Sequence, residues 1–118
     1  MIQGTVTEDG VPTIQVAVSG RQWQATLDTG FNGDLELPES LRASVNAQPR
    51  GRLHFLLAGG QTIEEMTFTV DFPFDGKTVK AQATFVGGNE ILIGTHLIRR
   101  YRLTIDFVAR TVLLDRAA

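Results

Sequence analysis

The chain has 118 residues, the length of one ordinary domain, and its 42% hydrophobic and 20% charged residues are typical of a globular protein. Its 11 Lys and Arg against 13 Asp and Glu give a net charge of -2, which offers no general attraction for the phosphate backbone of nucleic acids. The absence of cysteine excludes disulfide scaffolds, thiol catalysis and cysteine-ligated metal centres, and no apolar run approaches the about 18 residues of a membrane span. We expect a single domain over 1–118, with no nucleic acid or membrane as partner.

Apolar and polar residues alternate along most of the chain with a period of two, the signature of half-buried strands. The alternating runs lie at 14–18, 22–27, 53–57, 66–72, 78–85, 103–107 and 112–114. Ser19-Gly20 and Asp75-Gly76 separate neighbouring runs and predict two hairpins. Only Pro38–Arg42 and Thr95–Tyr101 look helical, because each carries end signals of a short helix. The pattern predicts an all-β fold, a small barrel or sandwich with one or two short helices.

Two segments interrupt the alternation and resemble each other. Residues 25–30 and 90–94 both lead apolar strand residues into a glycine, and a helix candidate follows each within about eight residues. The first of them ends in Asp28-Thr29-Gly30. A glycine lets the chain turn sharply with no side chain over the carboxylate, while a threonine hydroxyl and backbone amides can orient it. The sequence therefore predicts that Asp28 is a presented carboxylate.

Four features in this order resemble the retropepsin-like aspartic proteases, which include small bacterial single-lobe members. They are the triplet Asp28-Thr29-Gly30, the segment 31–38, the glycine-tipped hairpin 58–61 and the apolar-to-glycine segment Leu92-Ile93-Gly94. The resemblance covers most of the chain. It implies a closed β-barrel of the acid-protease type, in which the two apolar-to-glycine segments interlock beneath an active site, and a homodimer with one catalytic aspartate from each chain.

The resemblance also implies a role for individual residues. Asp28-Thr29-Gly30 is the catalytic triplet, in which Thr29 orients and buttresses the aspartate. Gly30 and Asn32 contact the backbone of a peptide substrate, and Gly59-Gly60 closes over it as a flap. One departure is Gly94-Thr95-His96, where retroviral members commonly carry Gly-Arg-Asp or Gly-Arg-Asn. The resemblance therefore implies no equivalent in this chain of the arginine contact that helps to stabilise the retroviral dimers.

The chemistry requires a pair of carboxylates. Two carboxylates about 3 Å apart cannot both ionise, so they share a proton; one acts as a base on water and the other donates a hydrogen bond to the scissile carbonyl. The chain holds one Asp-Thr-Gly, and isoleucine stands at the corresponding place of its second apolar segment. A two-fold axis between two copies of Asp28 supplies the missing half. We expect a homodimeric aspartic endopeptidase that needs no metal or other cofactor.

Other interpretations stay open. A protease-like β-domain that dimerises and binds a peptide or protein without cutting would keep the same residues, and an unrelated small β-barrel would be a monomer. Residues 28–39 match part of an EF-hand loop, but Gly30 at its third position supplies no side-chain oxygen, so we expect no calcium site. His54 and His96 are expected as surface or helix residues, and the arginines of 99–102 as a solvated or interface patch. No secretory signal is visible at Met1, so the expected location is the cytoplasm.

Overall fold

The structure, a computed structural model, describes residues 1–117, without the side chains of Leu53 and Phe55. It consists of ten strands and one short 3-10 helix. In chain order these are β1 (Ile2–Val6), β2 (Pro12–Val18), β3 (Arg21–Leu27), β4 (Leu35–Pro38), η1 (Glu39–Ser44), β5 (Gln48–Leu56), β6 (Thr62–Phe74), β7 (Lys77–Val86), β8 (Ile91–Ile93), β9 (Tyr101–Asp106) and β10 (Thr111–Arg116). No helix of this described part is long and apolar enough to cross a membrane.

Both predicted hairpins are confirmed, and their turns have the expected backbone. Ser19 and Gly20 join β2 to β3 with φ values of 52° and 79°, and Asp75 and Gly76 join β6 to β7 with 54° and 74°. Positive φ at both central residues is the two-residue turn that matches the twist of antiparallel strands. The turn chemistry therefore fixes the register of these strands.

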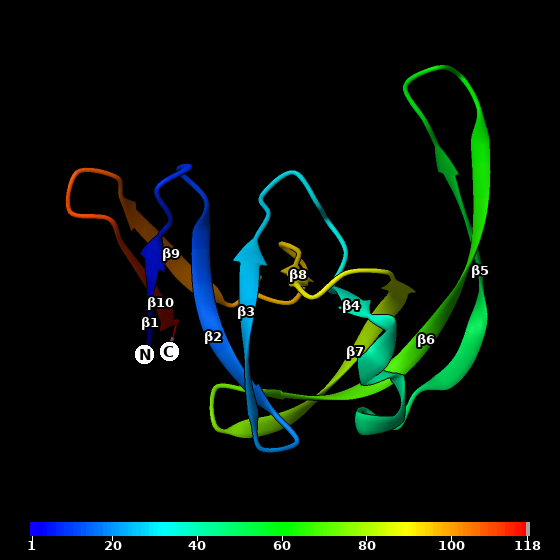
Figure 1. Cartoon of the computed structure of the whole chain (residues 1–118), viewed down its shortest axis with the longest axis horizontal. Helices are drawn as coiled ribbons and strands as arrows, with labels where there is room; N and C mark the ends of the chain where they lie inside the picture. The colour runs from blue at the N-terminus through cyan, green and yellow to red at the C-terminus, as the bar shows by residue number, and fades with distance from the viewer. Residues whose placement is uncertain (118) are drawn as a thin grey trace.

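All ten strands form one sheet in the order β5-β6-β7-β4-β8-β3-β2-β1-β10-β9. The pairs β3–β8 and β4–β7 are parallel and the other pairs are antiparallel. The sheet curls so that β2 crosses β6, and the core lies inside this curl (Figure 1). The largest fully buried side chains there include Ile14, Leu35, Leu37, Phe72 and Ile93. Alternate residues of most strands thus share one core, as the period of two predicted.

The predicted all-β fold is confirmed, but the predicted closure of the barrel is not. The strand order begins at β5 and ends at β9, and these two strands do not pair within residues 1–117. The outer part of the β5–β6 hairpin stands away from the rest of the sheet (Figure 1). Leu56, Ile63 and Met66 are exposed there, because the chain offers this end of the hairpin no apolar surface to pack on. The sheet is open and curled.

The two predicted helices have different outcomes. Glu39–Ser44 forms η1, a 3-10 helix in which Arg42 donates hydrogen bonds to Glu39 one turn earlier. Residues 95–100, by contrast, form turns and no helix. The amides of Thr95 and His96 donate to carbonyls of another loop, and β9 already begins at Tyr101. The remaining residues are too few for an α-helix, whose first turn is costly to form.

Candidate active site

Asp28 is fixed at the point where β3 ends. Leu27 is buried in the core and pairs with Ile93 of the parallel strand β8. The backbone N–H of Asp28 donates to the Ile93 carbonyl at 2.9 Å and so extends this pairing by one residue. Because successive side chains of a strand point to opposite faces, the Asp28 side chain leaves the core face on which Leu27 lies. The backbone of Asp28 is therefore held by the core, while its half-buried side chain is presented outside it.

The triplet forms a tight turn around the carboxylate. The Gly30 amide donates to Asp28 Oδ1 at 2.9 Å, and the Phe31 amide donates to the Asp28 carbonyl at 3.1 Å. A Cβ atom at position 30 would lie only 3.2 Å from Oδ1. Glycine therefore lets the amide approach the carboxylate closely, which agrees with the predicted presentation of Asp28.

The loop after Asp28 is fastened by the second apolar-to-glycine segment. Three successive amides donate to its carbonyls: Gly94 to Asp34 at 2.9 Å, Thr95 to Phe31 at 2.8 Å and His96 to Gly33 at 3.2 Å. A Cβ atom at Gly94 would lie 2.2 Å from the Gly33 carbonyl oxygen. Only glycine permits this close approach. The predicted interlocking of the two segments is thus present, and it supports the loop that carries Asp28.

A side-chain pair that sequence reasoning missed adds to this support. Asp34 is buried; its Oδ2 accepts a hydrogen bond from the Gln82 amide at 2.9 Å, and its Oδ1 lies 2.5 Å from His96 Nδ1. His96 was expected as a surface or helix residue. Its side chain is 56% exposed, but one ring nitrogen is engaged by Asp34 and no helix forms around it. Asp34 and His96 lie 62 residues apart, so no local pattern announces their contact.

Glu36 is a second carboxylate on the face that Asp28 occupies. Its neighbours Leu35 and Leu37 are in the core, so its half-buried side chain lies on the opposite face of β4. Partial burial raises the pKa of Glu36, and the negative charges of Glu65 and Asp28 raise it further. The Asp28 and Glu36 carboxylates therefore lie close enough for their negative charges to repel each other. The alternation around Glu36 was the available sequence signal for this placement.

The other predicted site residues lie at the surface, and Thr29, Gly30 and Asn32 are exposed in the same loop as Asp28. Within residues 1–117 the Thr29 hydroxyl makes no hydrogen bond, so its role in orienting a carboxylate pair stays a prediction. Gly59-Gly60 forms the tip of the β5–β6 hairpin, where Leu57 and Gln61 close the turn and Gly60 has a φ of 81°. This tip and the Asp28 loop project from the same end of the molecule without meeting (Figure 1).

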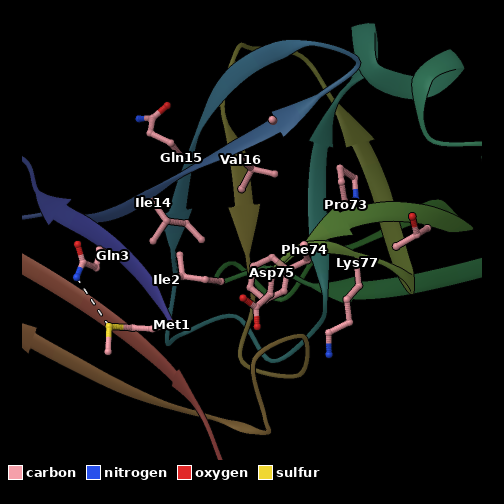
Figure 2. A pocket seen from close by; sticks show the side chains of 13 residues that line it. Met1, Ile2, Gln3, Ile14, Gln15, Val16, Pro73, Phe74, Asp75 and Lys77 are labelled. Carbon is pink, nitrogen blue, oxygen red and sulfur yellow. Dashed lines mark hydrogen bonds between the residues drawn. The ribbon is translucent and has the colours of Figure 1, made fainter.

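A hollow of about 630 Å³ lies elsewhere, between β1–β2 and the β6–β7 turn. Figure 2 shows Ile2, Ile14, Val16 and Phe74 around it, with Asp75 and Lys77 at its border. No residue of the Asp28 loop lines it. It lies inside the curl of the sheet, between strands that are not hydrogen-bonded neighbours. In the described part of the chain, no three histidine or acidic side chains are grouped to hold a metal ion.

Several solved structures have a similar fold. A retropepsin-like aspartic protease from Rickettsia conorii is 20% identical and superposes with a TM-score of 0.67, covering 96% of this chain and 88% of that one. The protease of Simian Foamy Virus (mac) is 16% identical, with a TM-score of 0.58 over 74% of this chain and 91% of that one. A foamy viral protease-reverse transcriptase in complex with an RNA/DNA hybrid is 18% identical, with a TM-score of 0.60 over 90% of this chain and 13% of that one.

No protein-family model and no curated protein sequence matches the chain. At identities of 16–20% the structural similarity establishes the fold alone. The chain has a retropepsin-like fold, and in this fold it carries an Asp-Thr-Gly turn at the end of β3.

Proposed function

We propose that this chain is one half of a homodimeric aspartic endopeptidase of the cytoplasm, in which the Asp28 carboxylates of two chains activate a water molecule. The observation that carries the proposal is the Asp28 turn. The Asp28 carboxylate accepts a hydrogen bond from the Gly30 amide. The amides of residues 94–96 donate hydrogen bonds to carbonyls of the Asp28 loop, and the whole arrangement lies within a retropepsin-like fold. A carboxylate held in this way by backbone groups is pre-organised for catalysis.

The reaction follows from two such carboxylates that share one proton. The ionised carboxylate takes a proton from water, and the oxygen of that water forms a bond to the carbonyl carbon of the peptide. The protonated carboxylate donates its hydrogen bond to the carbonyl oxygen, where negative charge develops. When the tetrahedral intermediate collapses, the carboxyl group that took a proton from water gives it to the nitrogen, the C–N bond breaks and the nitrogen leaves as an amine. The products are a new carboxyl terminus and a new amino terminus.

The exposed residues of the same end of the molecule are assigned to the substrate. Gly30 and Asn32 contact the peptide backbone beside Asp28, and Gly59-Gly60 closes over it. The exposed apolar side chains of the β5–β6 hairpin, Leu56, Ile63 and Met66, support this assignment, since a bound peptide or a second chain would cover them. Thr29 buttresses the carboxylate pair in the dimer.

Asp28→Asn tests the proposal. The amide is close in size to the carboxylate but cannot act as a base, so cleavage of a mixed-sequence peptide library, measured by mass spectrometry, falls at least about 100-fold. Circular dichroism and sedimentation should show that the variant keeps the fold and the assembly of the wild type. Asp9→Asn is the matched control, because Asp9 is exposed in the turn after β1 and the same chemical change there leaves cleavage unaltered. Substantial activity in Asp28→Asn contradicts the proposal, and a wild type that binds peptides but cleaves none favours the non-catalytic alternative.

A further inference from the structure

A row of side chains crosses four neighbouring strands on the face that carries Asp28. The strands β3, β8, β4 and β7 lie side by side in this order (Figure 1). Their register places Thr26 opposite Leu92, Leu92 opposite Glu36, and Glu36 opposite Thr84. Residues paired in register point to the same face of a sheet, and Asp28 follows Thr26 by two positions. The row therefore lies beside the Asp28 carboxylate.

Glu36 carries an unbalanced negative charge in this row. Partial burial raises the pKa of Glu36, and the negative charges of Glu65 and Asp28 raise it further. Within residues 1–117 no lysine, arginine or histidine forms an ion pair with Glu36 or Glu65. A carboxylate that is partly desolvated and has charged neighbours of the same sign is unfavourable in the folded state, and such groups gather at functional sites. A bound cation would remove the imbalance.

Thr84 adds a second polar group next to Glu36. Its neighbours Ala83 and Phe85 pack on the core, so Thr84 points to the face that Asp28 occupies. The Thr84 side chain is only 9% exposed, yet its hydroxyl makes no side-chain hydrogen bond in the described part of the chain. Polar groups buried to this extent are normally paired. A ligand with hydrogen-bond donors would satisfy the hydroxyl and the carboxylate together.

The long cationic side chains of lysine and arginine match this row. Their charged ends carry several N–H donors, which suit the Glu36 carboxylate and the Thr84 hydroxyl. Their alkyl stems pack on apolar surface while the charged end reaches a polar group. Leu92 is half-buried beside Glu36 and supplies that surface. An acidic side chain would instead be repelled by Glu36 and Glu65, and a short neutral one would leave Glu36 without a partner.

The position of the row relative to Asp28 defines which substrate residues reach it. Glu36 lies two strands away from β3, about 10 Å across the sheet, while an extended peptide advances about 3.3 Å per residue. The side chain that meets Glu36 therefore belongs to a residue within about three positions of the bond that is cut. In a dimer the second chain brings its own Glu36, so the same preference applies on both sides of that bond.

We propose that Glu36 and Thr84 form a subsite for a lysine or arginine side chain of the substrate, with Leu92 along its alkyl stem. The inference rests on the proposed function, since it names the substrates of the same site: proteins with basic residues within about three positions of the cut bond. Glu36 contacts the substrate and not the reacting atoms, so it determines which peptides are cut.

Cleavage of a mixed-sequence peptide library, analysed by mass spectrometry, tests the subsite. Lysine and arginine should be enriched near the cut bonds. For a cleaved peptide that contains such a lysine, kcat/KM should exceed that of its glutamine counterpart at least about tenfold, the effect of one hydrogen-bonded charge. Glu36→Gln should abolish this ratio. Glu36→Lys should invert the preference toward glutamate, which a merely structural role would not do.

Glu8→Gln is the matched control. Glu8 is exposed in the turn between β1 and β2, so the same charge change there should leave the ratio unchanged. A protein that cleaves peptides without a preference for basic residues, or keeps that preference in Glu36→Gln, overturns the subsite and leaves the proposed function standing.

Peptide binding provides a readout that does not depend on catalysis. Fluorescence anisotropy with the Asp28→Asn protein compares a pool of mixed apolar peptides that each carry one lysine with the same pool carrying glutamine instead. The lysine pool should bind at least about tenfold more tightly, and Glu36→Gln should remove the difference. Equal affinity for the two pools overturns the subsite. A wild type that cleaves nothing, together with tighter lysine binding that requires Glu36, overturns the proposed function and leaves the subsite standing.

Discussion

Gly94→Ala probes the contact that supports the Asp28 loop. The added Cβ atom would lie 2.2 Å from the Gly33 carbonyl oxygen and 2.7 Å from the Phe31 carbonyl oxygen, both closer than such contacts occur in proteins. These neighbours are backbone atoms, so no flexible side chain can move aside. The loop after Asp28 and the segment after β8 must separate.

The expected cost follows from two contributions. Forcing one extra carbon into a packed site costs about 1–3 kcal/mol. The separation also strains the three backbone hydrogen bonds from residues 94–96, each worth about 0.5–1.5 kcal/mol net, and we expect the loss of one of them. Gly94→Ala should therefore lower the free energy of unfolding by about 1.5–4.5 kcal/mol, a large part of the stability of a small domain.

Urea denaturation followed by circular dichroism measures this change, at one fixed chain concentration because association stabilises the folded state. Gly87→Ala is the matched control. Gly87 precedes β8, a Cβ atom there meets nothing within 4 Å, and the substitution should change stability by less than about 0.5 kcal/mol. A Gly94→Ala protein as stable as the control would refute the view that the close approach at Gly94 supports the Asp28 loop.

Two further predictions concern pH. Glu36→Gln should stabilise the fold more at pH 7 than near pH 3 in thermal melts. The raised pKa of Glu36 makes its ionised form unfavourable in the folded state, so the wild type loses stability as the pH rises through that pKa. A larger gain in acid than at neutral pH would contradict this sign. The rate of peptide cleavage should follow a bell in the acid to near-neutral range, since the Asp28 pair has to hold one proton. Activity still rising past about pH 9, or lost to chelators, would indicate another nucleophile or a metal.

The parts of the fold that sequence predicted are those set by neighbouring residues. The hairpins follow from Ser19-Gly20 and Asp75-Gly76, whose left-handed backbone selects the turn type. The Asp28 turn follows from three consecutive residues, because the Gly30 amide reaches the carboxylate two positions before it. Local chemistry of this kind is visible in the sequence without knowledge of the rest of the fold.

The parts that were missed depend on residues far apart. Thr95–Tyr101 carries helix signals, but Thr95 and His96 are bound to the distant loop of Phe31 and Gly33, and β9 begins at Tyr101, which leaves too few residues for a helix. The pairing of Asp34 with His96 likewise arises only when β8 passes between β3 and β4. Closure of the barrel was inferred from the resemblance. A sheet closes only if its two edge strands pair, and the alternation of residues within each strand does not determine which strands pair.

The central claim, that each chain contributes one catalytic carboxylate, is tested most directly by mixing chains. Wild type and Asp28→Asn are unfolded together, refolded at a constant total concentration, and assayed for peptide cleavage as the mutant fraction rises. If both carboxylates of a dimer are needed, equal mixing leaves about a quarter of the wild-type activity, because only a quarter of randomly formed dimers carry two Asp28 residues. An activity that falls in proportion to the mutant fraction, with half remaining at equal mixing, would show that one chain suffices and would contradict the account.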